Sequence, residues 1–293
     1  MRIIRLKSGC ALPALELTLR EQYFISTDET APAWLSAFTA MKLAKAADKT
    51  GATAIEIGRT DDIIAAISAR KLTKTAGVKI IVNLPPDFPT PLSLPGEYLR
   101  EVDLWVFPSE RMRTEYAELG QLKRSEVIFP ACFDKKILTA AETQPCEKKD
   151  KPATADSLTY LVILRPQCDT VVMNKIIDTV DAADRDIRVL FLGQSRAGEI
   201  MPVIRRSRNT LHPERYEWLG DNYDLAGLLS AGANVIKAGK DITSSEAAAP
   251  LFGASIIETS QINRQCGATG NLVPAPMTPD NYVRQLAHAI QKL

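Results

Sequence analysis

The sequence of 293 residues has no excess of charge of either sign, since 36 basic and 35 acidic side chains leave a formal net charge of +1. Proteins that bind nucleic acid through its phosphates need a basic surface, so this balance argues against a nucleic-acid partner. The local cluster Arg205-Arg206-Ser207-Arg208 fits a solvated helix end, and a polyphosphate site is the alternative.

The chain also lacks a run of about 18 apolar residues, so no membrane-spanning helix is expected. Residues 1–7 are too few and too charged for a signal peptide. Five cysteines, an odd number without a close pair, fit a reducing compartment and argue against disulfides or a zinc site. Two histidines are too few for histidine-based metal chemistry. We therefore expect a cytoplasmic protein without a metal, for which a peripheral membrane contact stays open.

The second half of the chain, residues 158–293, alternates short apolar runs with helical patterns. This alternation predicts a parallel sheet with helices on both faces, and such sheets bind small molecules at the carboxyl ends of their strands. The apolar runs are 160–164, 189–193, 216–220, 234–236 and 255–257, and the helical patterns cover 171–180, 197–208, 225–229, 244–251 and about 278–292.

The first half repeats this organisation. The polar, proline-bearing stretch 139–157 separates the halves and predicts a linker. We therefore expect an α/β protein of two Rossmann-like, doubly wound domains, 1–138 and 158–293, that face each other across a cleft. The expected strands are 2–6, 22–26, 54–57, 78–82, 104–107 and 126–129, and helices are expected from 31 to 50, from Asp61 to Gly77 and from Ser109 to Gly120.

A proline-rich stretch, residues 85–95, leaves the carboxyl end of the strand predicted at 78–82. It carries five prolines. The pattern fits a stiff surface loop, and a loop that lines a substrate is the alternative.

Several segments of this sequence occur in an order that resembles glycosyltransferase family 4, whose members have the GT-B fold. VDLWVFPSERMR at 102–113 is similar to the block in which a strand runs into "Ser-Glu" and a helix, and EVIFPACFD at 126–134 is similar to the segment before the family's linker. The resemblance spans roughly residues 50 to 293. The other matching segments are DIRVLFLG at 186–193, YEWLG at 216–220 with Asp224-Leu225 behind it, and GNLV at 270–273.

The resemblance implies a nucleotide-sugar donor on the second domain and an acceptor on a shortened first domain, with the last helix crossing back. It implies transfer to a glycan, lipid-linked or protein acceptor, with retention and without metal or cofactor, since the nucleotide sugar is the substrate. It indicates no catalytic residue here. The expected donor-binding residues are Arg165, Glu246, Ser244, Ser245 and Lys237, and the expected acceptor-side or cleft residues are Asn83, Ser109 and Glu110.

Four departures separate the sequence from the family pattern. The glycine-rich turn after the first strand is reduced to Gly9, and Asn83 stands near the position of a frequent histidine. Asp169 stands where a lysine usually follows the arginine matched by Arg165. Ala238, eight positions before Glu246, replaces the first of two glutamates.

The donor residues also have structural interpretations. Arg165 fits a phosphate clamp or a surface arginine at a strand end. Glu246 fits a ribose ligand, but Thr243-Ser244-Ser245-Glu246 is also a capping box, in which the glutamate binds back to its own helix start. Lys237 fits either a phosphate contact or an exposed lysine.

Three functions therefore stay open at this stage. The first is an active glycosyltransferase. The second is a degenerate relative that serves as a scaffold or subunit of a partner transferase, which the missing lysine, glutamate and glycine-rich turn favour. The third is a different α/β enzyme such as a dinucleotide-dependent one, which is disfavoured because no G-x-G-x-x-G follows a strand.

Overall fold

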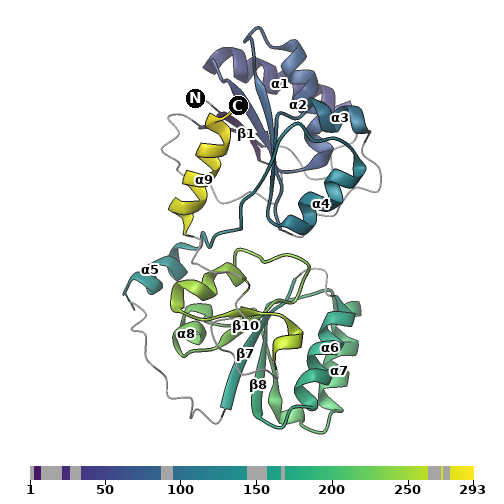
Figure 1. Cartoon of the computed structure of the whole chain (residues 1–293), viewed down its shortest axis with the longest axis vertical. Coiled ribbons are helices and arrows are strands. Elements are labelled where there is room, and N and C mark those ends of the chain that lie inside the picture. The colour runs from purple at the N-terminus through teal and green to yellow at the C-terminus, as the bar shows by residue number, and fades with distance from the viewer. Residues whose placement is uncertain are drawn as a thin grey trace. The chain divides into compact units, whose positions relative to one another are not determined.

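A computed structural model of the chain describes residues 3–7, 22–26, 34–86, 95–143, 157–165, 169–262, 272 and 278–293. The chain divides into two compact units: unit 1 is Met1–Pro130 with Pro279–Leu293, and unit 2 is Ala131–Thr278. Each unit contains one parallel sheet with helices packed on it (Figure 1), which confirms the predicted α/β class with two Rossmann-like sheets.

Unit 1 is built on a six-stranded sheet in the order β2-β1-β3-β4-β5-β6, in which every neighbouring pair is parallel. The strands lie within a residue or two of the predicted ones. They are β1 (Ile3–Lys7), β2 (Gln22–Ser26), β3 (Ala54–Ile57), β4 (Lys79–Asn83), β5 (Leu104–Phe107) and β6 (Ser125–Val127); the helices are α1 (Trp34–Thr50), η1 (Thr60–Asp62), α2 (Ile63–Leu72), α3 (Gly96–Glu101), α4 (Glu110–Leu119) and α9 (Pro279–Gln291).

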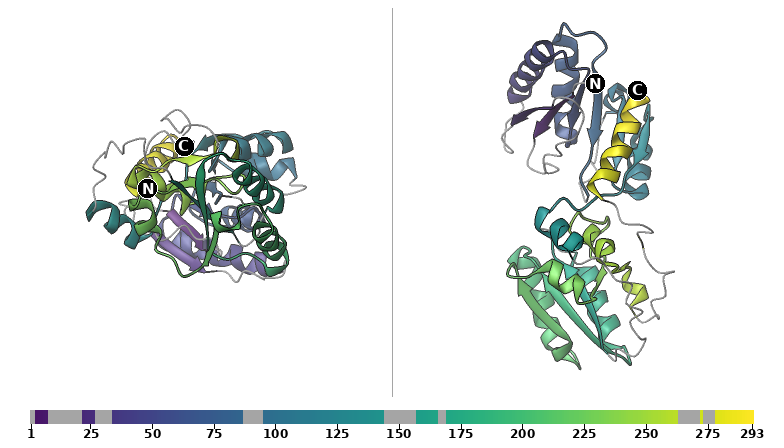
Figure 2. Two further views of the ribbon diagram at one scale, coloured as in Figure 1. Left: turned by 90° about the horizontal axis from the view of Figure 1, so that it is seen from below. Right: turned by 90° about the vertical axis from the view of Figure 1, so that its left-hand side faces the viewer.

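Successive side chains along each strand of unit 1 point to opposite faces of the sheet, and both faces are covered. Ile55, Val82 and Trp105 point into a core shared with α1, α2, α3 and α4. The opposite face carries Glu56 and Asn83, and α9 runs along it (Figure 2). Both faces are therefore buried, which explains why the strands read as nearly continuous apolar runs.

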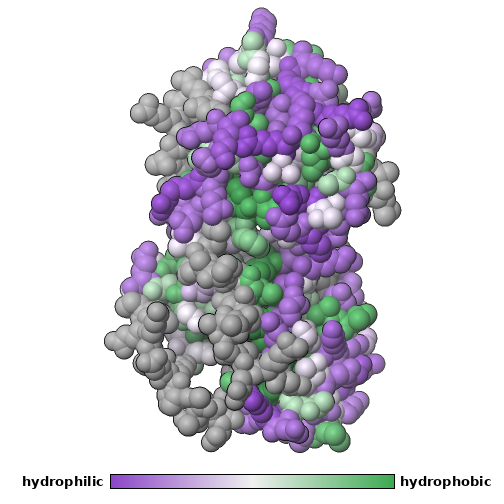
Figure 3. Space-filling model, in the orientation of Figure 1, coloured by the Kyte–Doolittle hydropathy of each residue, from purple (hydrophilic) through white to green (hydrophobic). Residues whose placement is uncertain are grey.

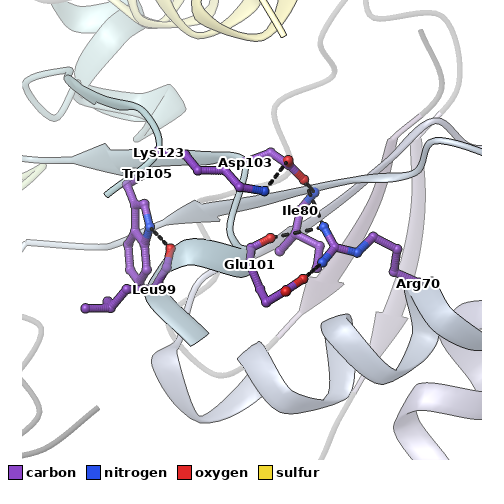
Figure 4. Close-up of polar contacts among 7 residues, drawn as sticks. All are labelled: Arg70, Ile80, Leu99, Glu101, Asp103, Trp105 and Lys123. Carbon is purple, nitrogen blue, oxygen red and sulfur yellow. Dashed lines mark hydrogen bonds and ion pairs between the residues drawn. The ribbon is translucent and has the colours of Figure 1, made fainter. Parts of the chain in front are cut away.

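Polar groups fix the amino end of this sheet (Figure 4). One oxygen of the Asp103 carboxylate accepts the backbone N–H of Ile80 at 2.9 Å and a guanidinium N–H of Arg70 at 3.2 Å. The other oxygen lies 3.3 Å from the ammonium of Lys123. Arg70, in the last turn of α2, also pairs with Glu101. These contacts join α2 to the end of α3, and Asp103, just before β5, to the start of β4.

Unit 2 is built on a five-stranded sheet in the order β11-β10-β7-β8-β9, also parallel throughout. The helical pattern predicted at 244–251 is a 3-10 helix that contains Pro250. The strands are β7 (Ser157–Ile163), β8 (Asp186–Leu192), β9 (Tyr216–Gly220), β10 (Asn234–Ile236) and β11 (Ile256–Ile257); the helices are α5 (Lys135–Thr143), α6 (Thr170–Asp181), α7 (Ala197–Arg208), η2 (Pro213–Arg215), α8 (Leu225–Ser230), η3 (Glu246–Phe252) and η4 (Thr259–Gln261).

The two faces of this sheet are covered by different helices. Leu161 and Val235 lie in a core with α5, α8 and η3. Tyr160 and Ile236, one residue away along the strands, lie in a second core with α6 and α7. The outer surface that Figure 3 shows is largely hydrophilic over the described residues of both units.

The predicted linker 139–157 overlaps an ordered helix. α5 covers Lys135–Thr143, and Ile137 is buried in the core of unit 2 because α5 packs on α8 and η3. Unit 2 therefore begins at Ala131 rather than at residue 158, and the first domain does not extend to residue 138. The rest of the predicted linker, 144–156, lies outside the described residues.

Some sequence interpretations concern other residues outside the described part of the chain. These are Gly9, most of the proline-rich stretch and most of the segment 270–273. No helix in the described ranges combines the length and the apolar character that crossing a membrane requires.

Two buried tyrosines of unit 1 provide a matched test of how α9 is held. The Tyr282 hydroxyl donates to Asn83 Oδ1 at 3.2 Å, whereas the Tyr116 hydroxyl has no hydrogen-bond partner among the described residues. We expect Tyr282→Phe to cost about 1 kcal/mol of stability, because it leaves a buried acceptor less satisfied. Tyr116→Phe should be neutral or stabilising, since it removes an unsatisfied hydroxyl.

Hydrogen–deuterium exchange of the full-length variants measures this difference. Exchange in α9 should be about fivefold faster in Tyr282→Phe than in the parent. Equal protection of α9 in both variants would show that the Tyr282 hydroxyl does not hold the helix.

Candidate functional site

The strand order of unit 2 defines one position at which a parallel sheet can open to a ligand. β7 and β10 are neighbours, but the chain leaves β7 toward α6 on one face and leaves β10 toward η3 on the other. In open α/β sheets a crevice forms outside the carboxyl ends of strands at such a switch point. The residues that follow β7 and β10 are therefore the first candidates for a site.

The structure brings Arg165 and Glu246 together at this switch point. Nη2 of Arg165 lies 2.8 Å from Oε2 of Glu246 and donates to the backbone oxygen of Asp241 at 2.6 Å. The side chain of Arg165 is 13% exposed and that of Glu246 is 0% exposed. The two predicted donor residues thus form a direct ion pair rather than two separate ends of a ligand site.

Glu246 also forms the predicted capping box. Its Oε2 accepts the backbone N–H of Thr243 at 2.7 Å, and its own backbone N–H donates to Oγ1 of Thr243 at 3.2 Å. Its other oxygen accepts the backbone N–H of Ala238 at 3.4 Å. A single buried carboxylate therefore joins the end of β7, the loop after β10 and the start of η3.

A cavity of about 450 Å³ opens beside these loops within unit 2. This volume lies in the range of small-molecule sites. Burial raises the pKa of the Tyr223 phenol, and the charge of Asp221 raises it further. The lining residues come from α5, from the segment after β9 and from the start of η3: Asp134, Lys136, Ile137, Ala140, Tyr223, Asp224, Leu225, Ala226, Gly227 and Ser245.

The other predicted donor residues differ in their surroundings. Ser245 is exposed and lines the cavity, and Ser244 precedes it with a half-buried side chain. The ammonium of Lys237 lies 2.7 Å from a carboxylate oxygen of Glu258. Lys237 therefore forms an ion pair with a neighbouring acid.

The two departures from the family pattern in unit 2 have structural roles. Asp169 is the N-cap of α6, where its carboxylate accepts the backbone N–H groups of Val171 and Val172. Ala238 is buried, and its N–H donates to Glu246. Neither position supplies a cation to the switch point.

The predicted acceptor-side residues lie in unit 1, at the carboxyl ends of β4 and β5. Asn83 is buried and donates to Oε1 of Glu56 at 2.9 Å. Ser109 is the N-cap of α4 and accepts the N–H of Met112, as its position in the sequence predicted. Glu110 pairs with Arg113 on the surface of the same helix. All three have local structural roles.

Sequence reasoning did not assign Tyr223, Asp134 or Gly239 to the site. Tyr223 follows the strand end at Gly220, so its place at the carboxyl edge was available from the sequence. Asp134 was missed because the helix that it begins was partly assigned to the linker. In the described part of the chain, no group of three or more His, Cys, Asp or Glu side chains is arranged to hold a metal ion.

No protein-family model matches this sequence, and no curated protein matches it. Solved structures do match its fold. Anabaena HepE in complex with UDP and glucose has a TM-score of 0.60 at 14% identity, over 99% of this chain and 90% of HepE. The apo lipopolysaccharide outer core galactosyltransferase WaaB has a TM-score of 0.62 at 15% identity, over 100% of this chain and 91% of WaaB.

A glycosyltransferase from Rickettsia africae is similar over 99% of this chain and 88% of its own, with a TM-score of 0.61 at 12% identity. These neighbours are GT-B glycosyltransferases. At such low identities the likeness shows the fold, and the expected GT-B architecture agrees with it.

The buried ion pair predicts a large stability effect at Glu246. We expect Glu246→Ala to destabilise unit 2 by about 3–5 kcal/mol, because it leaves Arg165 without its buried counter-charge. Glu217→Ala is the control, since the Arg188–Glu217 pair is exposed and should contribute less than about 1 kcal/mol. Urea denaturation of the full chain, with exchange of peptides from β7 and β10 as the local probe, measures both. Similar losses in the two variants would contradict a special role for the buried pair.

Proposed function

We propose that the protein is a glycosyltransferase, similar to family 4, which transfers a sugar from a nucleotide-sugar donor to a glycan, lipid-linked or protein acceptor. The observation that carries the proposal is the position of Arg165. Its guanidinium is held at the switch point of the unit 2 sheet, in a chain whose fold matches GT-B glycosyltransferases over nearly its whole length.

In this proposal Arg165 binds the diphosphate of the donor. A guanidinium can donate two parallel hydrogen bonds to phosphate oxygens, and such charge-assisted bonds are about twice as strong as neutral ones. The cavity of unit 2 is large enough for a nucleoside, and its lining includes Tyr223 and Ser245, the residue before Glu246. HepE has been solved with UDP and with UDP-glucose, which makes UDP the first nucleotide to test.

The proposed reaction breaks the bond between the anomeric carbon and the diphosphate oxygen and forms one to an acceptor oxygen, whose proton is released. Arg165 would stabilise the negative charge on the leaving diphosphate, so that no metal is needed for that step. Retention of configuration is proposed from the family resemblance alone. None of the residues described above is assigned as a base.

A scaffold or subunit of a partner transferase is the second candidate. The observation that favours it is that three positions, which bind the nucleotide-sugar donor in the family, have structural roles in this chain. Asp169 caps a helix, Ala238 carries no charge, and Glu246 is fully buried against Arg165. A chain with these features would keep the fold and lose turnover.

Nucleotide binding by the full chain tests the proposed donor site. We expect UDP, or another nucleoside diphosphate from a panel, to raise the melting temperature, because a ligand that binds only the folded state stabilises it. Arg165→Ala should weaken the binding about tenfold or more, since it removes a charge-assisted contact of roughly 1.5–3 kcal/mol. Arg188→Ala, at an exposed ion pair, is the matched control and should bind like the parent.

Calorimetry followed by a turnover assay with UDP-sugars then separates the two candidate functions. Binding with release of UDP supports the transferase, and binding without release supports the scaffold. If the parent binds no nucleoside diphosphate, the proposal of a donor site at Arg165 is wrong.

A further inference from the structure

Gly239 lies against the guanidinium of Arg165. A Cβ atom at position 239 would lie 1.9 Å from Nη1 and 2.2 Å from Cζ of Arg165, far inside any possible contact distance. The backbone of Gly239 is not in the left-handed region, so alanine would be compatible with its conformation. Glycine is therefore required at this position to leave space for the Arg165 guanidinium, not to allow a particular backbone conformation.

Three groups together fix the guanidinium. Gly239 provides the space, the backbone oxygen of Asp241 accepts from Nη2 at 2.6 Å, and Oε2 of Glu246 accepts from the same nitrogen at 2.8 Å. We call these four residues, Arg165, Gly239, Asp241 and Glu246, the arginine cluster. Apart from Arg165 at the end of β7, all of them come from the segment that follows β10.

The burial of Glu246 decides which partner it serves. Its side chain is 0% exposed, so no ligand atom can touch its carboxylate while Arg165 stays in place. The ribose contact that the family resemblance implied is therefore closed in this arrangement. The carboxylate acts on Arg165 instead.

We propose that Gly239 and Glu246 are positioning residues, which hold the Arg165 guanidinium at the switch point for the diphosphate of the donor. The proposal rests on the proposed function, because it assumes that Arg165 meets phosphate. A side chain fixed before the ligand arrives loses less conformational freedom on binding, which favours affinity. Neither Gly239 nor Glu246 touches the ligand; each acts through Arg165.

The test compares UDP with uridine, because only UDP carries the phosphates. In Gly239→Ala the methyl group displaces the guanidinium, so the ratio of UDP affinity to uridine affinity should fall about tenfold while uridine affinity is kept. Glu246→Gln should lower the same ratio, since it keeps the size of the side chain but replaces the charge-assisted bond that positions Arg165 with a weaker one. Gly198→Ala is the control, because the space around that exposed helical glycine is open.

A double-mutant cycle identifies the route of the effect. If Gly239 acts through Arg165, Gly239→Ala should change neither UDP affinity nor melting temperature once Arg165→Ala is present. In the parent background the same change should lower the melting temperature by about 3 °C, because overpacking a buried site is destabilising.

The outcomes separate this inference from the proposed function. If the parent binds UDP and Gly239→Ala has the same ratio of UDP affinity to uridine affinity as the parent, the positioning role is overturned. The proposed donor site is then unaffected. Equal effects of Gly239→Ala with and without Arg165 also overturn it. A parent that binds no nucleoside diphosphate overturns the proposed function and, with it, the phosphate role of the arginine cluster.

Discussion

The buried carboxylate of Glu246 is the contact on which the carboxyl edge of unit 2 depends. β7 and β10 are adjacent in the sheet, but their chains leave toward opposite faces, and backbone N–H groups after β10 would lack sheet partners there. Glu246 accepts from Ala238, from Thr243 and from the guanidinium of Arg165. A buried charge is tolerated only when it is paired and hydrogen-bonded in this way. The same contacts that satisfy the carboxylate also fix a cation at the switch point, the position at which open α/β sheets generally bind ligands.

Most of the fold could be predicted from the sequence, because both faces of each sheet are buried and the strands read as apolar runs. The strand at 216–220 and the helix at 197–208 were placed at their observed bounds. The helix α5 was not predicted, because most of its residues are polar and only one side of it, at Ile137, is buried in a core. The local composition is typical of a linker, but the segment forms a helix because Ile137 packs into the core of unit 2.

The sequence predicted that Arg165 and Glu246 are candidate site residues, but it did not predict their contacts. The resemblance indicated Arg165 and Glu246, and the capping box indicated a structural role for Glu246; the structure shows the box. The ion pair between them could not be read from the sequence, because 80 residues and three crossover connections separate them along the chain. Gly239 had no sequence signal either, since its backbone is ordinary and its importance comes only from the side chain beside it.

The two units use polar groups at their carboxyl edges for different purposes. In unit 1, Asn83 and Glu56 are buried and bonded to each other, and Tyr282 of the last helix donates to the same asparagine. That edge holds the end of the chain in place. In unit 2 the paired groups instead hold a cation at the switch point of the sheet, and Ser245, the residue before Glu246, lines a cavity of about 450 Å³. A fixed guanidinium and a cavity in the same unit favour an anionic ligand with a bulky group attached. A nucleoside diphosphate meets both requirements.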